Sequence, residues 1–157
     1  VLTLQSTENE RPKVKNKRDV LEFLASRQML EEERTFVIYL DSGLGVVDLR
    51  AVRSGTSISA SNEAASLVAQ GITLQAAGIL VVDNCPNGKS WPNAPSGQLL
   101  SQLEFLTRET GICVLDSLSI SGNVISSYAL PRHEDKALEA RRFPSFKFWG
   151  NTISNRG

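Results

Sequence analysis

The chain has very little histidine and cysteine, the residues on which many catalytic sites depend. Its 157 residues include one histidine, His133, and two cysteines, Cys85 and Cys113. Two cysteines do not form a disulfide framework. His133 stands at no recognisable spacing to activate Cys85 as a nucleophile. Cys113 alternates with apolar neighbours inside a predicted strand, so we expect it in the core.

The chain also lacks an excess of charge of either sign. Lysine plus arginine and aspartate plus glutamate both number 17, so the net charge is zero. That balance argues against the broad positive field that drives non-specific DNA binding. No run of 18 apolar residues is present, which excludes a membrane-spanning helix. The first 20 residues lack the apolar core of a signal peptide, so we expect a cytoplasmic protein.

The remaining composition is that of one globular domain. Hydrophobic residues make up 41% of the chain and charged residues 22%, which is close to average globular usage. The length suits a single domain. We expect a disordered or extended N-terminal segment over residues 1–15, the domain itself over residues 16–130, and an aromatic and basic tail over residues 131–157.

Hydrophobic periodicity predicts alternating helices and strands. The predicted helices cover residues 17–27, from 59 or 61 to 70, and 98–110; the predicted strands cover residues 35–40, 46–52, 78–82, 112–115, 118–120 and 124–129. Asn16 is a candidate N-cap, and Gly71 and Gly111 are candidate helix ends. Asp116 would end its strand as a turn or hydrogen-bonding residue. This order predicts a mixed α/β fold with helices packed on a sheet.

The loop of residues 83–88, Asp-Asn-Cys-Pro-Asn-Gly, is the most informative segment. It follows an apolar run that is typical of a buried strand, and polar loops at strand ends are common places for chemistry. Three interpretations follow. We favour a strand-ending turn in which Cys85 is inert. The others are a metal site that uses Asp83 and Cys85, and a site with Cys85 as nucleophile.

Several segments resemble, in order, the RadC-like branch of the JAB/MPN (JAMM) family. They are residues 13–24, similar to the family's leading segment; 33–41, similar to its glutamate-bearing strand; 54–56, similar to its Ser/Gly-Gly-Thr turn; 111–116, similar to its Gly-Ile-x-Leu-Leu-Asp strand; and 126–127, similar to its closing serine. The resemblance covers about residues 13–130. It implies a JAB/MPN-like mixed β-sheet flanked by helices, in the three-layer arrangement of cytidine deaminases.

The resemblance also implies where a metal site would lie. The family's loop reads His-Asn-His-Pro-Ser-Gly, and its histidines and a later aspartate hold a zinc ion that activates water, while a glutamate moves the proton. Placed without gaps, Glu33 matches the glutamate, and Asp83 and Cys85 fall at the two histidines. Asn93 falls at the family's serine and Ser96 at its aspartate. A three-residue slip would put Ser96 on the serine, but the aspartate is lost either way.

These changed ligands imply a catalytically inactive RadC-like domain that acts as a protein-binding or scaffolding module, with no cofactor expected. Inactive members of the wider family serve in assemblies, often as dimers, so the resemblance implies a protein partner or a homo-oligomer. RadC proteins also carry a DNA-repair label. The alternative is a zinc-dependent JAMM-type hydrolase with a variant site of Glu33, Asp83 and Cys85, because cysteine and aspartate are legitimate zinc ligands.

Aromatic side chains concentrate in the tail. Four of the chain's ten aromatic residues lie within seven positions, namely Phe143, Phe146, Phe148 and Trp149. We favour packing of this cluster on the domain's own surface. A surface for a protein partner is the second interpretation. The third is stacking on single-stranded nucleic acid beside Arg142 and Lys147. Trp91, in the 90–97 loop, is a further candidate for partner contact.

Overall fold

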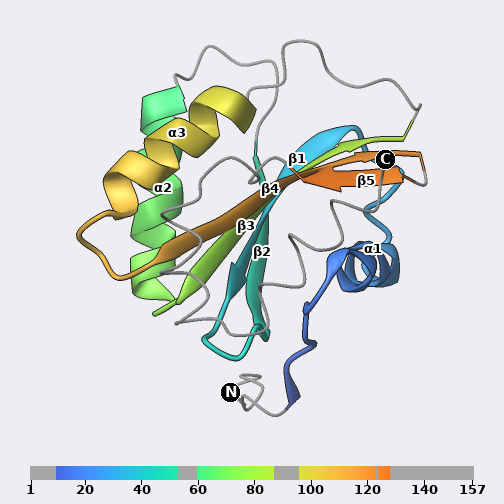
Figure 1. The fold of residues 1–157 in the computed structure, drawn as a ribbon, viewed down its shortest axis with the longest axis horizontal. Helices are drawn as coiled ribbons and strands as arrows, with labels where there is room; N and C mark the ends of the chain where they lie inside the picture. Colours follow the sequence, from blue (N-terminus) through green and yellow to red (C-terminus); the bar gives the residue numbers. More distant parts are fainter. Residues whose placement is uncertain (1–9, 53–59, 87–95, 123, 128–157) are drawn as a thin grey trace, which may run out of the picture.

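The computed structural model describes residues 10–52, 60–86, 96–122 and 124–127. Within these ranges, five strands form a mixed sheet whose order is β2-β1-β3-β4-β5 (Figure 1). Helix α1 (Lys17–Ser26) packs on one face of the sheet, and α2 (Ala60–Thr73) and α3 (Ser96–Thr107) pack on the other. The predicted mixed α/β fold with helices on a sheet is therefore confirmed.

The strands pair in both directions. They are β1 (Arg34–Leu40), β2 (Val46–Val52), β3 (Gly78–Cys85), β4 (Cys113–Ser121) and β5 (Val124–Ser127). The β1–β2, β1–β3 and β4–β5 pairs are antiparallel, and the β3–β4 pair is parallel. A parallel pair needs a crossover connection, and α3 supplies it here. No helix in the described ranges is long and apolar enough to cross a membrane.

Strand β3 is buried along its whole length, and its side chains alternate between two cores. Leu80 and Val82 belong to the core beneath α1. Ile79 and Val81 belong to the core beneath α2 and α3. Burial on both faces explains the continuous apolar run in the sequence, which strands in the middle of a covered sheet typically show. The same alternation decides which way the polar residues that follow will point.

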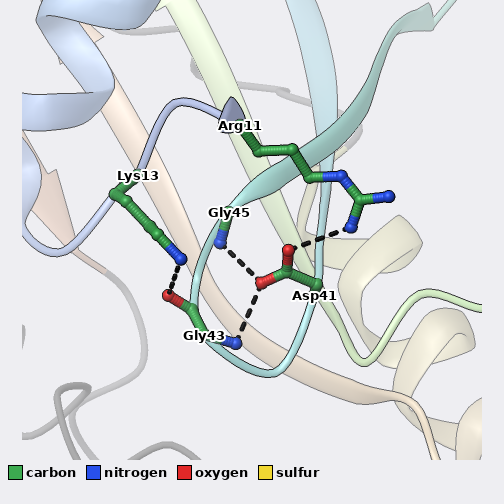
Figure 2. Close-up of polar contacts among 5 residues, drawn as sticks. All are labelled: Arg11, Lys13, Asp41, Gly43 and Gly45. Carbon is green, nitrogen blue, oxygen red and sulfur yellow. Dashed lines mark hydrogen bonds and ion pairs between the residues drawn. The ribbon is translucent and has the colours of Figure 1, made fainter. Parts of the chain in front are cut away.

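The N-terminal segment before α1 is attached to the turn between β1 and β2. The Val14 amide donates to the Leu44 carbonyl at 2.9 Å, the Val46 amide donates to the Pro12 carbonyl at 2.8 Å, and the Val14 side chain is 0% exposed. Asp41 completes the attachment: its carboxylate accepts hydrogen bonds from the Gly43 and Gly45 amides and from Arg11 (Figure 2).

Helix α1 begins where the sequence predicts. The Asn16 side-chain oxygen accepts a hydrogen bond from the Asp19 amide at 2.9 Å, which confirms Asn16 as the N-cap. Gly111 does not cap α3, because the helix ends at Thr107 and three turn residues separate the two. Gly111 has a φ of 84°, in the left-handed region that favours glycine. Cys113 is partly buried against the core beneath α1.

Further sequence predictions are wrong. The expected loop does not begin at residue 83, because β3 continues through Asp83 and Asn84 to Cys85. Gly71 does not end α2, which continues to Thr73. Instead, Gly71 is buried where the helix meets the sheet: a Cβ there would lie 3.1 Å from the Ile112 Cδ1 atom and 3.3 Å from the Tyr39 ring. Asp116 does not end its strand, because β4 continues through it to Ser121. Asp116 is 0% exposed, and its carboxylate accepts the Ser117 amide at 2.7 Å.

Candidate functional site

Glu33, Asp83 and Cys85 lie at the same end of the β1–β3 ladder. Asp83 and Cys85 are in the last three residues of β3, and Glu33 immediately precedes β1. The antiparallel register pairs Arg34 with Asn84 and Thr35 with Asp83. Alternation along each strand places Asp83 and Cys85 on the face that α2 and α3 cover. The sheet thus brings together three positions that the sequence separates by about 50 residues.

Asp83 is buried in the sheet and bonded to a neighbouring strand. Its side chain is 3% exposed, and its Oδ1 atom accepts a hydrogen bond from the Thr35 hydroxyl at 2.6 Å. Thr35 is itself 1% exposed. A short hydrogen bond to a carboxylate is stronger than one between neutral groups. The sequence analysis missed Thr35, and only the register between β1 and β3 reveals it.

Asn84 points to the other face of the sheet and holds the segment that leads into β1. Its side chain is 1% exposed, and its Nδ2 group donates to the Leu30 carbonyl at 2.9 Å and to the Glu32 carbonyl at 2.8 Å. The Met29 carbonyl lies farther away, at 3.5 Å. Asn84 therefore fixes the backbone just before Glu33, a role that the sequence did not signal.

Cys85 and Glu33 differ in exposure. Cys85 is 3% exposed and forms no disulfide, whereas Glu33 is exposed. Reactive cysteines lie in partly exposed, electropositive surroundings, while buried structural cysteines are inert. The burial of Cys85 thus argues against its use as a nucleophile on an external substrate.

A family model for the RadC-like JAB domain matches residues 14–134. The chain belongs to this family. The match extends over α1, α2, α3 and all the described strands, and it includes residues 83–88. The resemblance found in the sequence is therefore confirmed over nearly its full extent. No curated protein matches the chain.

The zinc ion that this family implies would need three protein ligands and an open position for water. In this RadC-like JAB domain, the described residues include no group of three or more histidine, cysteine, aspartate or glutamate side chains that could hold a metal. Asp83 is hydrogen-bonded to Thr35 within the sheet. The described side chains by themselves therefore do not complete a three-ligand zinc site.

Several predicted site residues lie outside the described part of the domain. Ser96 is the first residue of α3, but its side chain is not described. Other positions lie wholly outside the described ranges: Trp91, Asn93, His133, Phe143, Phe146, Phe148 and Trp149. The candidate site therefore consists of Glu33, Asp83 and Cys85, with Thr35 and Asn84 added by the structure.

The lowered pKa of Asp41 belongs to the opposite end of β1. Burial alone would raise this pKa, but hydrogen bonds from the Gly45 amide, Arg11 and the Gly43 amide, together with the charge of Lys13, lower it below 3.8. Perturbed carboxyl groups are often functional. Here the partners of Asp41 are the turn and the N-terminal segment, so its role is to hold the chain together.

Proposed function

We propose that the chain is a non-catalytic RadC-like JAB domain that acts as a cytoplasmic protein-binding or scaffolding module. The observation that carries this proposal is the buried hydrogen bond between Thr35 and Asp83. Asp83 stands at the position of the family's first histidine, and its carboxylate accepts a hydrogen bond from a residue of the neighbouring strand β1. The Thr35 hydroxyl occupies one acceptor position of this carboxylate, and the burial of Asp83 restricts access to the others.

The chemistry of the remaining residues supports the same proposal. Hydrolysis of the family's kind needs a water made acidic by a metal and a base that takes its proton. Glu33 is exposed and can accept a proton, but the sequence offers a serine, Ser96, where the third metal ligand is expected. The hydroxyl of serine is a poor replacement for a carboxylate. The domain would keep the base and lack the group that activates the water.

A variant zinc hydrolase is the second candidate, and one observation favours it. Glu33, Asp83 and Cys85 lie at the same end of the β1–β3 ladder, and all three carry groups that can bind zinc. This candidate requires Asp83 to bind the metal through a carboxylate position that the Thr35 hydroxyl does not use. It also requires a metal to reach Asp83 and Cys85 in their buried positions.

Metal analysis of protein purified without chelator separates the two candidates. We expect far less than one zinc per chain and no peptide or isopeptide hydrolysis. About one zinc per chain would refute the non-catalytic proposal, provided that Cys85→Ala and Asp83→Ala abolish the binding. Cys113→Ala is the matched control, because Cys113 pairs with Gly78 at the far end of β3 and should leave the zinc content unchanged.

The binding role has its own tests. We propose a protein partner, or a second copy of the chain as in the dimers of inactive relatives. Light scattering after gel filtration measures the mass in solution and so tests whether the chain forms a dimer. A link to DNA repair rests on the family label. Direct binding of nucleic acid through the tail is the less favoured candidate, because the chain has no net charge. Single-strand binding that survives deletion of residues 141–157 would exclude the tail as its site.

A further inference from the structure

We infer that Asp83 and Asn84 form a two-sided brace that fixes the start of β1 through hydrogen bonds and without a metal ion. Consecutive side chains of a strand point to opposite faces of the sheet. One dipeptide at the end of β3 can therefore hold a neighbouring strand from both sides. The brace goes beyond the proposed binding role, since it does not depend on what the domain binds.

On the face beneath α2 and α3, the brace is the bond between Thr35 and Asp83. These residues are partners in the β1–β3 register, so this side-chain bond is formed in addition to the backbone hydrogen bonds between the two strands. Both residues are buried: Thr35 is 1% exposed and Asp83 is 3% exposed. A carboxylate in such surroundings needs donors, because a buried charge without hydrogen bonds is strongly unfavourable.

On the face beneath α1, the brace is the side-chain amide of Asn84. Its two N–H groups match two carbonyl groups, those of Leu30 and Glu32, at 2.9 and 2.8 Å. The segment that carries these carbonyls connects α1 to β1. Its backbone hydrogen bonds include those from the Met29 amide to the Leu24 carbonyl at 2.9 Å and from the Glu32 amide to the Met29 carbonyl at 3.3 Å. Asn84 adds side-chain donors for the Leu30 and Glu32 carbonyls.

The two halves of the brace meet at one point of the chain. Asn84 holds residues 30 and 32 from one side, and Asp83 holds residue 35 from the other. Glu33 and Arg34 lie between these anchors. The end of the sheet that carries the candidate site is thus held in position by side chains of β3.

Hydrogen–deuterium exchange of the peptide that covers residues 29–36 tests the brace. Asn84→Asp removes both donors and turns an oxygen toward the two carbonyls, and Thr35→Val removes the hydroxyl at nearly constant volume. A tenfold rise in exchange corresponds to about 1.4 kcal/mol, which is roughly the loss of one such bond. We therefore expect exchange in this peptide to rise roughly tenfold in Thr35→Val and by more in Asn84→Asp, which loses two bonds. Thr35→Ser retains the hydroxyl and should restore most of the protection.

Thr73→Val is the matched control, because the exposed Thr73 hydroxyl bonds only to the Ala69 carbonyl of its own helix in the described structure. It should leave residues 29–36 unchanged, and the amides of α2 serve as the internal reference in every variant. Equal exchange in Asn84→Asp, Thr35→Val and Thr73→Val would overturn the brace.

A further exchange experiment uses the wild-type protein, so it does not depend on whether a variant folds. We expect the same exchange in residues 29–36 with added zinc and with a chelator. Exchange that slows with zinc and quickens with chelator would overturn the metal-free brace. Zinc bound at one per chain with unchanged exchange in this peptide would instead contradict the non-catalytic proposal and leave the brace intact.

Discussion

Asp41 is the residue whose removal should most clearly loosen the attachment of the N-terminal segment. It is 8% exposed, and it accepts hydrogen bonds from the Gly43 amide at 2.9 Å, the Gly45 amide at 2.8 Å and Arg11 at 3.0 Å. Gly43 is exposed, so water can satisfy its amide after the change. Gly45 is buried, and an unsatisfied buried amide costs about 1–3 kcal/mol.

The Arg11 guanidinium adds a smaller contribution, because it is partly exposed and such pairs contribute about 0.2–1 kcal/mol. We therefore predict that Asp41→Ala lowers the free energy of unfolding by about 1–4 kcal/mol. For a chain of this size, that change corresponds to a fall in Tm of roughly 2–16 °C. Urea unfolding followed by circular dichroism measures the free energy, and calorimetry measures Tm.

Two variants control this prediction. Asp41→Asn retains one acceptor oxygen for the turn amides and loses the charge, so its effect should be smaller than that of Asp41→Ala. Glu22→Ala removes an exposed carboxylate that pairs only loosely with Arg18, at 3.6 Å, and it should change stability by no more than about 0.5 kcal/mol. If Asp41→Ala were no more destabilising than Glu22→Ala, the reasoning about the buried Gly45 amide would be refuted.

The dependence on pH follows from the lowered pKa of Asp41. Its carboxyl has a pKa below 3.8 in the folded state, because the bonds from Gly45, Arg11 and Gly43 and the charge of Lys13 outweigh the effect of burial. The unfolded chain thus takes up the proton first as the pH falls. The stabilisation from Asp41 is complete above the unfolded pKa and is lost as the pH falls through the folded pKa. The stability difference between wild type and Asp41→Asn should therefore narrow below pH 3.8.

Two further predictions concern the core beneath α2 and α3. Burial raises the pKa of Tyr39 to about 12. Stability should therefore fall as the pH rises above 10, because the phenol then ionises in the unfolded chain first. Absorbance near 295 nm, the band of the phenolate, should show one tyrosine that titrates late. Tyr39→Phe, which loses the 2.7 Å bond to the Leu67 carbonyl, should abolish that late step. Gly71→Val should lower stability by about 1–3 kcal/mol in urea unfolding, because the added methyl groups would clash with Tyr39 and Ile112. Unchanged stability would show that the helix can move away from the sheet.

The fold was largely predictable, because its strongest signals are local. The apolar runs of β1 and β3, the Asn16 cap and the turn of residues 41–45 all follow from neighbouring residues. The errors arose where a distant contact overrides a local preference. Gly71 is a natural helix end, but it allows α2 to approach Tyr39. Asp116 and Ser117 look like a strand end, but both are buried and pair with Leu80 and Val81 of β3, and β4 continues through them.

The candidate site was only partly predictable. Glu33, Asp83 and Cys85 were identified through the family resemblance. It related Glu33 to two residues that lie about 50 positions later in the sequence. The sequence by itself determined which chemical groups are present: one carboxylate and one thiol in the 83–88 loop, and a serine where a third metal ligand is expected. Those identities are enough to question zinc chemistry, because ligand type is a property of the residues.

Only the tertiary structure decided what these groups do. Asp83 lies 48 positions from Thr35 in the sequence, and the antiparallel register of β1 and β3 makes them partners. The alternation of β3 then turns Asn84 to the other face, toward the carbonyls that precede β1. Hydrogen bonding depends on distance and direction, and the sheet sets both. For that reason the sheet brings Asp83 and Asn84, which the sequence places beside a candidate metal site, into hydrogen bonds with the residues around the start of β1.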